Sequence, residues 1–223
     1  MILFRGFEPL DVFGPLEALQ TLSLWFHLEL TLISENSTDP VSTAPILASM
    51  NRQNSSFFQT IVPTATHDTA PKDLEVLIIP GGAGSRSPYL NSTLDYIRDS
   101  YPNLNYLLTV CTGSLIAGRS GILDGKRATT NKLAFLSVQS AVPNVKWQSH
   151  ARWVVDGNIW TSSGVSAGID MTLEFIECWY GKKIATNVTN FIEYERHTDP
   201  RWDPFADIVG LPDPNESLVV QHR

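Results

Sequence analysis

The sequence predicts a single α/β domain in which helices cover both faces of a mostly parallel β-sheet. Two nearly continuous apolar runs, residues 74–79 and 106–110, each end directly in a loop of glycine and other small residues that leads towards a predicted helix. Buried parallel strands have this pattern. Strand and helix signals alternate along all 223 residues without a repeat or a linker, which favours one α/β/α sandwich of three layers.

The first half of the chain starts with an apolar run at residues 1–4 that is too short to assign alone. Pro15 suits the first turn of a helix, and leucines follow it at helical spacing up to Leu22. Alternating or apolar runs and helical periodicity then predict strands over residues 27–34, 57–62 and 74–79, and a helix over residues 91–101.

The second half continues the alternation. We expect strands over residues 106–110 and 128–130, and helices over residues 114–120, 132–140, 169–180 and 184–194. Asp156-Gly157 stands between two apolar runs and predicts a β-hairpin over residues 153–160. The domain is expected to span residues 1–205, and four prolines beyond Asp199 predict an extended tail over residues 206–223.

Composition excludes several functional classes. The formal net charge is -7, so we expect no binding to nucleic acid or to an anionic membrane. No run of about 18 apolar residues predicts a transmembrane helix. Two cysteines cannot form a disulfide framework, and the five histidines form no HxxxH or HxH pair. We therefore expect neither a metal nor a cofactor.

Localisation is predicted from the N-terminus, which lacks a basic segment followed by a long apolar stretch. Without a signal peptide we expect a cytoplasmic protein. Five Asn-x-Ser/Thr sequons are the one feature that points towards secretion, and we interpret them as unglycosylated coincidences. They are at Asn36, Asn54, Asn91, Asn187 and Asn215.

Cys111 is the strongest candidate for a reactive residue. It stands where the apolar run 106–110 meets a helix of glycine and small side chains, which is the pattern of a nucleophile elbow. The N-terminus of that helix favours a thiolate, so we expect a lowered pKa for the Cys111 thiol. The alternative is a buried cysteine that only packs, which is our interpretation of Cys178 among large apolar residues.

Asp11 has two interpretations. It precedes a Gly-Pro helix start, and the sequence alone favours a helix N-cap. The functional interpretation is a carboxyl beside the thiol, whose burial would raise its pKa and suit it to general acid catalysis. Glu17 is the competing carboxylate, and we expect it to be exposed.

Gly81-Gly82 follows the run 74–79, so it could lie beside the Cys111 elbow. Glycine lets a backbone N–H approach a reacting atom closely, and together with the amide of Thr112 this loop could form an anion hole. A plain tight turn explains the glycines equally well, and no Gly-Lys-Ser/Thr follows that would make it a phosphate-binding P-loop.

Several stretches together resemble the DJ-1/PfpI superfamily, within the class I glutamine-amidotransferase-like fold. The resemblance extends over residues 1–205 and implies a flavodoxin-like sandwich. The most similar branch is the isocyanide hydratase-like one, because Asp stands in the first motif and Cys-Thr-Gly at the elbow. The matching stretches are residues 6–15, 79–84, 110–115, 125–130, 156–158 and 163–170.

This resemblance implies a role for each candidate residue. Cys111 would be the nucleophile, Asp11 the general acid or base, and Thr112 a residue that positions the substrate or a water. The anion hole would use the amides of Gly82 and Thr112. Glycines of the substrate-binding loops would be Gly81, Gly82 and Gly113. The resemblance also implies a homodimer with the active site near the subunit interface.

The resemblance implies a hydratase that converts an isocyanide, a small molecule, into an N-substituted formamide. One departure bears on the alternatives: many relatives have His after the Ala-Thr-Thr motif, and here Asn131 occupies that position. This argues against a glyoxalase III-like activity on 2-oxoaldehydes. An enzyme of specialised metabolism with another substrate, and a non-enzymatic redox-sensing or binding protein, remain as further alternatives.

Overall fold

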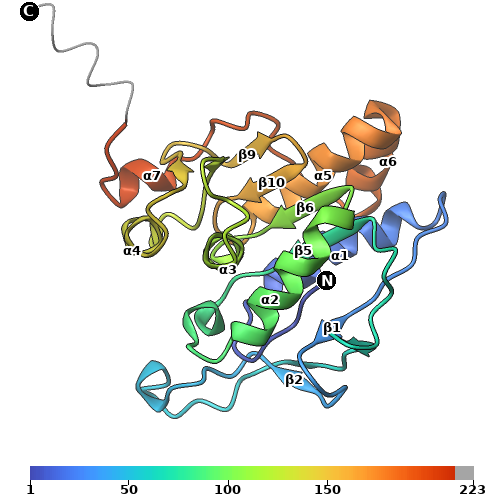
Figure 1. The fold of residues 1–223 in the computed structure, drawn as a ribbon. Coiled ribbons are helices and arrows are strands. Elements are labelled where there is room, and N and C mark those ends of the chain that lie inside the picture. The colour runs from blue at the N-terminus through green and yellow to red at the C-terminus, as the bar shows by residue number, and fades with distance from the viewer. Residues whose placement is uncertain (214–223) are drawn as a thin grey trace, which may run out of the picture.

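A mostly parallel sheet runs through the middle of the molecule (Figure 1). The computed structural model describes residues 1–213, so the sequon at Asn215 lies outside the described residues. The strand order is β5 (Val76–Ile79), β6 (Tyr106–Thr109), β10 (Ile159–Ser162) and β9 (Trp153–Asp156). β5, β6 and β10 are parallel, and β9 is antiparallel to β10.

Residues 1–4 extend this sheet by joining it to a second pair of strands. Ile2 N–H donates to the Ile78 carbonyl at 2.9 Å, while Leu3 N–H donates to the Ile33 carbonyl at 2.7 Å. Ile33 belongs to β1 (Ile33–Ser34), which pairs in parallel with β4 (Ala65–Thr66). The short N-terminal run therefore lies between β1 and β5.

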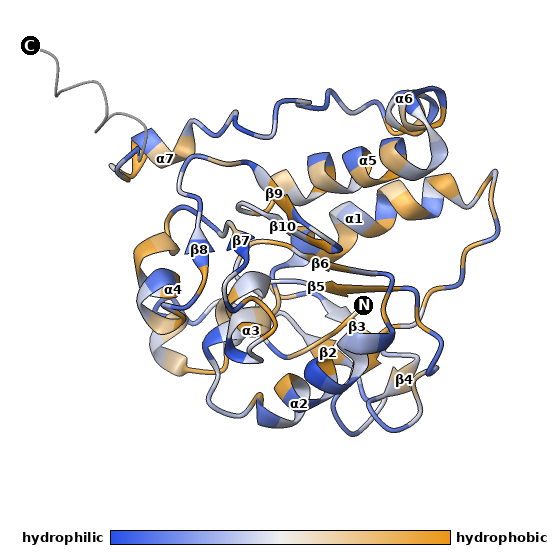
Figure 2. Ribbon diagram, turned by 45° about the horizontal axis from the view of Figure 1, so that its top comes forward, coloured by the Kyte–Doolittle hydropathy of each residue, from blue (hydrophilic) through white to orange (hydrophobic). Residues whose placement is uncertain are grey.

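Helices cover both faces of the sheet, which gives the three layers that the sequence predicts (Figure 2). α1 packs with α5 and α6 on one face, and α2, α3 and α4 lie on the other. The helices are α1 Pro9–Leu22, α2 Asn91–Ser100, α3 Gly113–Arg119, α4 Phe135–Ala141, α5 Ala167–Tyr180, α6 Lys182–Phe191 and α7 Phe205–Ile208. The remaining strands are β2 Val41–Ser42, β3 Thr60–Ile61, β7 Arg127–Ala128 and β8 Lys146–Trp147.

The core follows from the apolar composition of the strands. Leu77, Ile79 and Leu107 on β5 and β6 are fully buried beneath the helices. A second apolar cluster fills the space between α1, α5 and α6, with Leu22 and Leu173 among its buried members. Burial of each such side chain contributes about 1.5–3 kcal/mol, so both helical layers are held by apolar packing.

The first helix is longer than the sequence predicts. α1 begins at Pro9, with Glu8 as its N-cap residue, and Pro15 lies inside the helix. Pro9 meets the preference for proline in a first turn, while the ring of Pro15 only removes one N–H donor from the helix interior. The expectation that Pro15 opens the helix is therefore wrong.

The strand predictions in the first half are only partly correct. Of residues 27–34, Ile33 and Ser34 alone form a strand, and Leu28 and Leu30 are exposed, so the leucine alternation does not line the core. Of residues 57–62, Thr60–Ile61 forms the strand β3. The hairpin prediction is confirmed, since Asp156 pairs with Ile159 across the turn.

The C-terminal region contains a feature that the prolines do not predict. Phe205–Ile208 forms the short helix α7, in a region predicted as extended. His150 Nε2 lies 3.0 Å from Asp207 Oδ1 and ties this helix to the domain. The part of the predicted tail at residues 214–223 lies outside the described residues.

Candidate active site

Cys111 lies in the tight turn between β6 and α3 with a backbone φ of 57°. This left-handed conformation is strained for a residue with a side chain, and it persists only where the surroundings hold it. Cys111 N–H donates to the Ser163 carbonyl at 3.1 Å. Its carbonyl accepts hydrogen bonds from Ser114 Oγ at 3.0 Å and from Thr130 Oγ1 at 3.1 Å. Both peptide groups of the elbow are thus fixed.

Glycines allow the elbow to form against the neighbouring strand. A Cβ atom on Gly113 would lie 2.1 Å from the Ile79 carbonyl oxygen, so no side chain fits there. Gly82 has a φ of 122°, which favours glycine, and a Cβ on it would lie 2.4 Å from the Gly6 carbonyl oxygen. These two positions therefore need glycine for backbone packing, whatever their part in catalysis.

Asp11 lies in the first turn of α1, and its side chain contacts the loop that follows β5. Gly81 N–H donates to Asp11 Oδ2 at 2.8 Å, and Asp11 is fully buried. The N-cap interpretation is therefore wrong, since Glu8 occupies that position. Asp11 Oδ1 is buried and makes no hydrogen bond within the described residues. One carboxylate oxygen is thus available to a reacting group.

Burial raises the pKa of Asp11 to about 7, against the lowering effect of the Gly81 hydrogen bond. The nearby charge of Glu8 raises this pKa further, and the neighbouring Cys111 side chain lowers it. The raised pKa agrees with the functional interpretation of Asp11. Its interaction with the Cys111 side chain brings the predicted acid and the predicted nucleophile together.

The thiol of Cys111 behaves differently from the prediction. Burial, followed by the charge of Asp11, raises its pKa to about 12. Backbone hydrogen bonds from Thr112 and Val165 act in the opposite direction but are outweighed. The expected lowered pKa is therefore wrong: removal of water and a neighbouring carboxylate outweigh the amides at the start of α3.

The predicted anion-hole residues are brought together in part. Gly82 N–H donates to Thr112 Oγ1 at 3.0 Å, and Ser85 Oγ donates to the same oxygen at 2.9 Å. The Gly82 amide is thus engaged by the Thr112 side chain. The amides that hydrogen-bond the sulfur of Cys111 are those of Thr112 and Val165. The sequence did not single out Val165, which has a φ of 45°.

Gly81 lies where three parts of the site meet. A Cβ atom on it would be 2.5 Å from the Thr112 nitrogen and 2.9 Å from Asp11 Oδ2. Any side chain here would push the acid away from the elbow. The close approach of these three residues explains why a glycine stands two residues after the end of β5.

Glu8 and Asn131 lie next to residues of the site. Glu8, which the sequence did not suggest, is half-buried, burial raises its pKa, and its charge raises the pKa values of both Asp11 and Cys111. Asn131 Oδ1 accepts a hydrogen bond from Ala134 N–H at 3.1 Å. A Cβ on Gly164 would lie 2.5 Å from Asn131 Nδ2. Asn131 therefore packs beside the turn at residues 163–165. Its amide side chain cannot exchange a proton as the histidine of many relatives can.

The other predicted carboxylate and thiol lie apart from this chemistry. Glu17 is exposed, as expected. Cys178 is also exposed, so the expectation that it packs in the core is wrong. Its helix, α5, turns this position outwards although large apolar residues adjoin it in the sequence.

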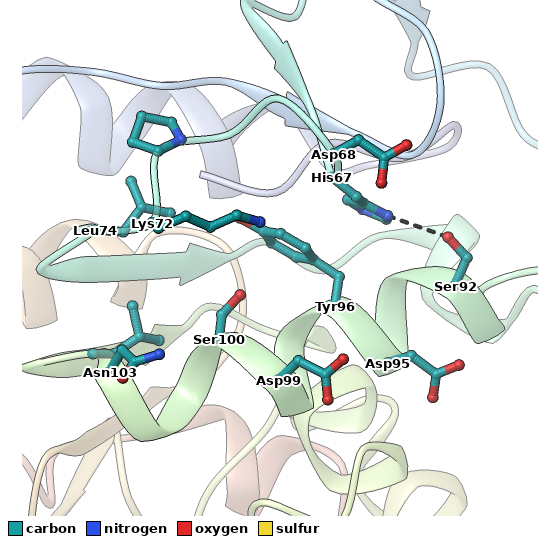
Figure 3. Close-up of a pocket in the computed structure, with 12 residues that line it drawn as sticks. His67, Asp68, Lys72, Leu74, Ser92, Asp95, Tyr96, Asp99, Ser100 and Asn103 are labelled. Atoms are coloured by element: carbon teal, nitrogen blue, oxygen red, sulfur yellow. Dashed lines mark hydrogen bonds between the residues drawn. The ribbon is translucent and has the colours of Figure 1, made fainter.

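A cavity of about 460 Å³ lies elsewhere, between residues 67–74 and α2 (Figure 3). His67 stacks on Tyr96 with ring centroids 4.5 Å apart, and its Nδ1 lies 3.2 Å from Ser92 Oγ. None of the predicted site residues lines this cavity. We locate the candidate site at Cys111 because the strained turn and the displaced pKa values are found there.

Residues 1–213 contain no cluster of three or more His, Cys, Asp or Glu side chains arranged to hold a metal ion. Within the same residues, no helix has the length and apolar character needed to cross a membrane.

Comparison with known proteins gives a consistent family. Residues 1–178 match the model of the DJ-1/PfpI family. The isonitrile hydratase of Pseudomonas putida is 34% identical over 98% of this chain and 85% of its own length. The crystal structure of a THiJ/PfpI family protein from Pseudomonas syringae superposes with a TM-score of 0.72 at 28% identity, covering 88% of this chain and 74% of that one.

Transcriptional regulators are also similar to part of the chain. The HTH-type regulator GbdR of Pseudomonas aeruginosa is 28% identical over 72% of this chain, which spans 44% of the regulator's length. The family thus includes both an enzyme and domains of regulators. The family model matches residues 1–178, and the isonitrile hydratase aligns with 98% of this chain. The chain therefore belongs to the DJ-1/PfpI family.

Proposed function

We propose that this protein is a cysteine-dependent hydratase that converts an isocyanide and water into an N-substituted formamide. The observation that carries the proposal is the buried pair of Asp11 and Cys111, in which one oxygen of the acid makes no hydrogen bond within the described residues. The 34% identity to an isonitrile hydratase along nearly the whole chain supports the choice of substrate class.

The pKa values of the pair suit a proton that moves between its members. Asp11 has a pKa of about 7 and Cys111 one of about 12, so above neutral pH the pair rests as a carboxylate and a thiol. The carboxylate accepts the thiol proton as the sulfur attacks, which makes Asp11 first a general base and then an acid. A pKa near the working pH is the most effective value for both steps.

The reaction follows from this proton transfer. The sulfur of Cys111 forms a bond to the terminal carbon of the isocyanide, and Asp11 returns its proton to that carbon, which gives a thioimidate. Water then adds to the thioimidate carbon, and Asp11 accepts one proton of the water and passes it to the nitrogen. The carbon–sulfur bond of the tetrahedral adduct breaks as its hydroxyl proton moves to the sulfur through Asp11, which restores the thiol and releases the N-substituted formamide. One water is consumed and nothing is oxidised or reduced.

The amides around the sulfur support the attack step. Thr112 and Val165 direct backbone hydrogen bonds to Cys111 and lower the pKa of its thiol. Donors of this kind are fixed before the reaction, so they stabilise the negative sulfur as the proton leaves. The same two amides can stabilise the sulfur again in the last step, when it is the leaving group.

Incubation with a simple aryl isocyanide tests the proposal. We expect formation of the aryl formamide with multiple turnovers by the wild type and loss of activity to background in Cys111→Ala. Cys178→Ala is the matched control and should retain full activity, because Cys178 is exposed on α5. Equal formamide production by wild type and Cys111→Ala would refute the proposal.

A ligand-binding, non-enzymatic role is the second candidate, and the similarity to part of a transcriptional regulator favours it. It predicts saturable binding of a small molecule without turnover. The isocyanide assay distinguishes the two roles. In a binding protein, bound isocyanide would protect Cys111 from an added alkylating reagent, and no formamide would be released.

We also propose that the chain forms a homodimer. Light scattering of the purified chain measures its mass in solution.

A further inference from the structure

The strained Cys111 turn is supported from a distant part of the chain. Its φ of 57° needs neighbours that fix the backbone on both sides. The residues that hydrogen-bond its peptide groups are Ser163, Ser114 and Thr130. Two of these, Ser163 and Thr130, are themselves connected to residues 199–205, here called the C-terminal segment.

The first connection is a series of peptide hydrogen bonds. Cys111 N–H donates to the Ser163 carbonyl at 3.1 Å, and Ser163 N–H donates to the Arg152 carbonyl at 2.7 Å. Arg152 N–H in turn donates to the Pro200 carbonyl at 2.7 Å. Three successive bonds thus lead from the N–H of the nucleophile to the C-terminal segment.

The second connection passes through a buried lysine. Thr130 Oγ1 donates to the Cys111 carbonyl, and Lys132 Nζ lies 3.4 Å from the Thr130 carbonyl. Lys132 Nζ also donates to Thr129 Oγ1 at 2.7 Å and to the Ala151 carbonyl at 2.8 Å. One ammonium group therefore holds together the turn that supports the elbow.

Asp203 of the C-terminal segment supplies the countercharge. Its Oδ2 lies 3.3 Å from Lys132 Nζ, and both side chains are at most 2% exposed. Lys132 Nζ also hydrogen-bonds Thr129, Thr130 and Ala151, so Asp203 places a negative charge beside an ammonium group that already has three partners. Without Asp203 the ammonium would be buried and uncompensated.

The energetics of this pair do not suggest a role in stability. Burial lowers the pKa of Lys132 to about 8, although the charge of Asp203 acts to raise it. The charged form is thus held at a net cost, and buried ion pairs are weak evidence for stability. A geometric function accounts better for the pair.

We infer that the C-terminal segment positions Cys111, through the Lys132–Asp203 ion pair on one side and the Pro200–Arg152–Ser163 hydrogen bonds on the other. Lys132 and Asp203 act as positioning residues, because they act on the nucleophile through the residues that hold its turn. The segment lies beyond residue 178, where the match to the family model ends. This positioning of Cys111 does not depend on which substrate the site binds.

Alkylation of Cys111 by iodoacetamide, followed peptide by peptide with mass spectrometry over a range of pH, tests the inference without a substrate. In the wild type, burial keeps the thiol pKa high and alkylation slow. Lys132→Met should loosen the elbow and expose the sulfur. We expect alkylation at pH 8 to accelerate about tenfold, corresponding to a fall of about one unit in the thiol pKa.

Two further variants separate positioning from stability. The double variant Lys132→Met/Asp203→Leu removes both buried charges, so its melting temperature should return to that of the wild type. Its alkylation should nevertheless stay fast, because the bonds from Lys132 Nζ to Thr129 and Ala151 are lost. Arg196→Met is the matched control: it breaks a partly exposed ion pair with Glu177 on α5 and should leave Cys111 alkylation unchanged.

A clear set of results would overturn the inference. If the double variant melts like the wild type and its Cys111 is alkylated at the wild-type rate and pH midpoint, the pair has no positioning role. The same conclusion follows if Arg196→Met accelerates alkylation as much as Lys132→Met. Failure of the isocyanide assay alone would refute only the proposed reaction, since alkylation does not depend on it.

Discussion

Asp11 and Asp170 show how differently two buried carboxylates can be used in one protein. Each lies in the first turn of a helix, α1 or α5, and neither is exposed to solvent. Asp170 faces Arg152, whose Nε and Nη2 lie 2.7 and 2.5 Å from its Oδ2, and its Oδ1 accepts the His197 N–H at 2.9 Å. Asp11 faces a thiol and one amide.

The difference lies in the countercharge. Oδ2 of Asp170 contacts the Arg152 guanidinium, and Oδ1 accepts the His197 N–H. The charge of Asp170 is therefore compensated, and the side chain joins α5 to the residues around His197. Within residues 1–213 no cation is among the contacts of Asp11, and burial raises its pKa to about 7. A buried carboxylate without a countercharge exchanges protons near neutral pH, which is what a catalytic acid or base requires.

The largest expected effect is on turnover. Asp11→Asn keeps the shape of the side chain but removes its ability to exchange a proton, so we expect formamide production to fall about 10²–10⁴-fold. Glu17→Gln is the matched control, because it neutralises an exposed carboxylate on the same helix and should leave turnover unchanged. An Asp11→Asn protein as active as the wild type would remove the distinction between the two carboxylates.

The next effect is on folding. Asp170→Asn leaves the buried Arg152 without its partner, and we expect a loss of about 3 kcal/mol or more in the free energy of unfolding measured in urea. Glu174→Gln, in the partly exposed pair with Arg196, should cost no more than about 1 kcal/mol. Similar losses in the two variants would show that burial does not govern these pairs.

A third effect is in the pH dependence of stability. The pKa of Asp11 rises from 3.8 to about 7 on folding, so between these values the folded state binds more protons than the unfolded state. Protonated Asp11 favours the folded state over ionised Asp11. This contribution to stability is complete below pH 3.8 and is lost as the pH rises through about 7. Each unit of displacement corresponds to about 1.4 kcal/mol.

We therefore expect Asp11→Asn to become more stable relative to the wild type as the pH rises from about 4 to about 7. Urea unfolding of both proteins across this range measures the difference, and the other titrating groups cancel in the comparison. A difference that is constant with pH would mean that Asp11 is no more desolvated in the folded protein than in the unfolded chain.

Much of the fold and part of the site could be predicted from the sequence. The apolar runs before Gly81 and Cys111 identify β5 and β6, and a strand that leads directly into a small-residue helix identifies the elbow. These signals are local. The environment of Asp11 was less certain, because a helix N-cap and a buried acid have the same local sequence.

The remaining features depend on contacts between distant residues. The amide of Val165 reaches Cys111 across 54 positions of the chain, and Asp203 reaches Lys132 across 71. The pKa of Cys111 was predicted with the wrong sign because burial and the position of Asp11 decide it, and neither is encoded in the helix start that suggested a thiolate. Exposure of Cys178 likewise depends on which face of α5 meets the sheet.

Residues 1–4 have a consequence for the order in which the molecule assembles. Ile2 pairs with Ile33 and hydrogen-bonds to Ile78, so the central sheet is continuous only after two loops of different length have closed around the first residues of the chain. Closure of long loops delays folding, because their entropy is lost before the contacts form. Residues 1–4 join the two parts of the sheet, and their synthesis precedes that of Ile78, to which Ile2 hydrogen-bonds, by some 75 residues.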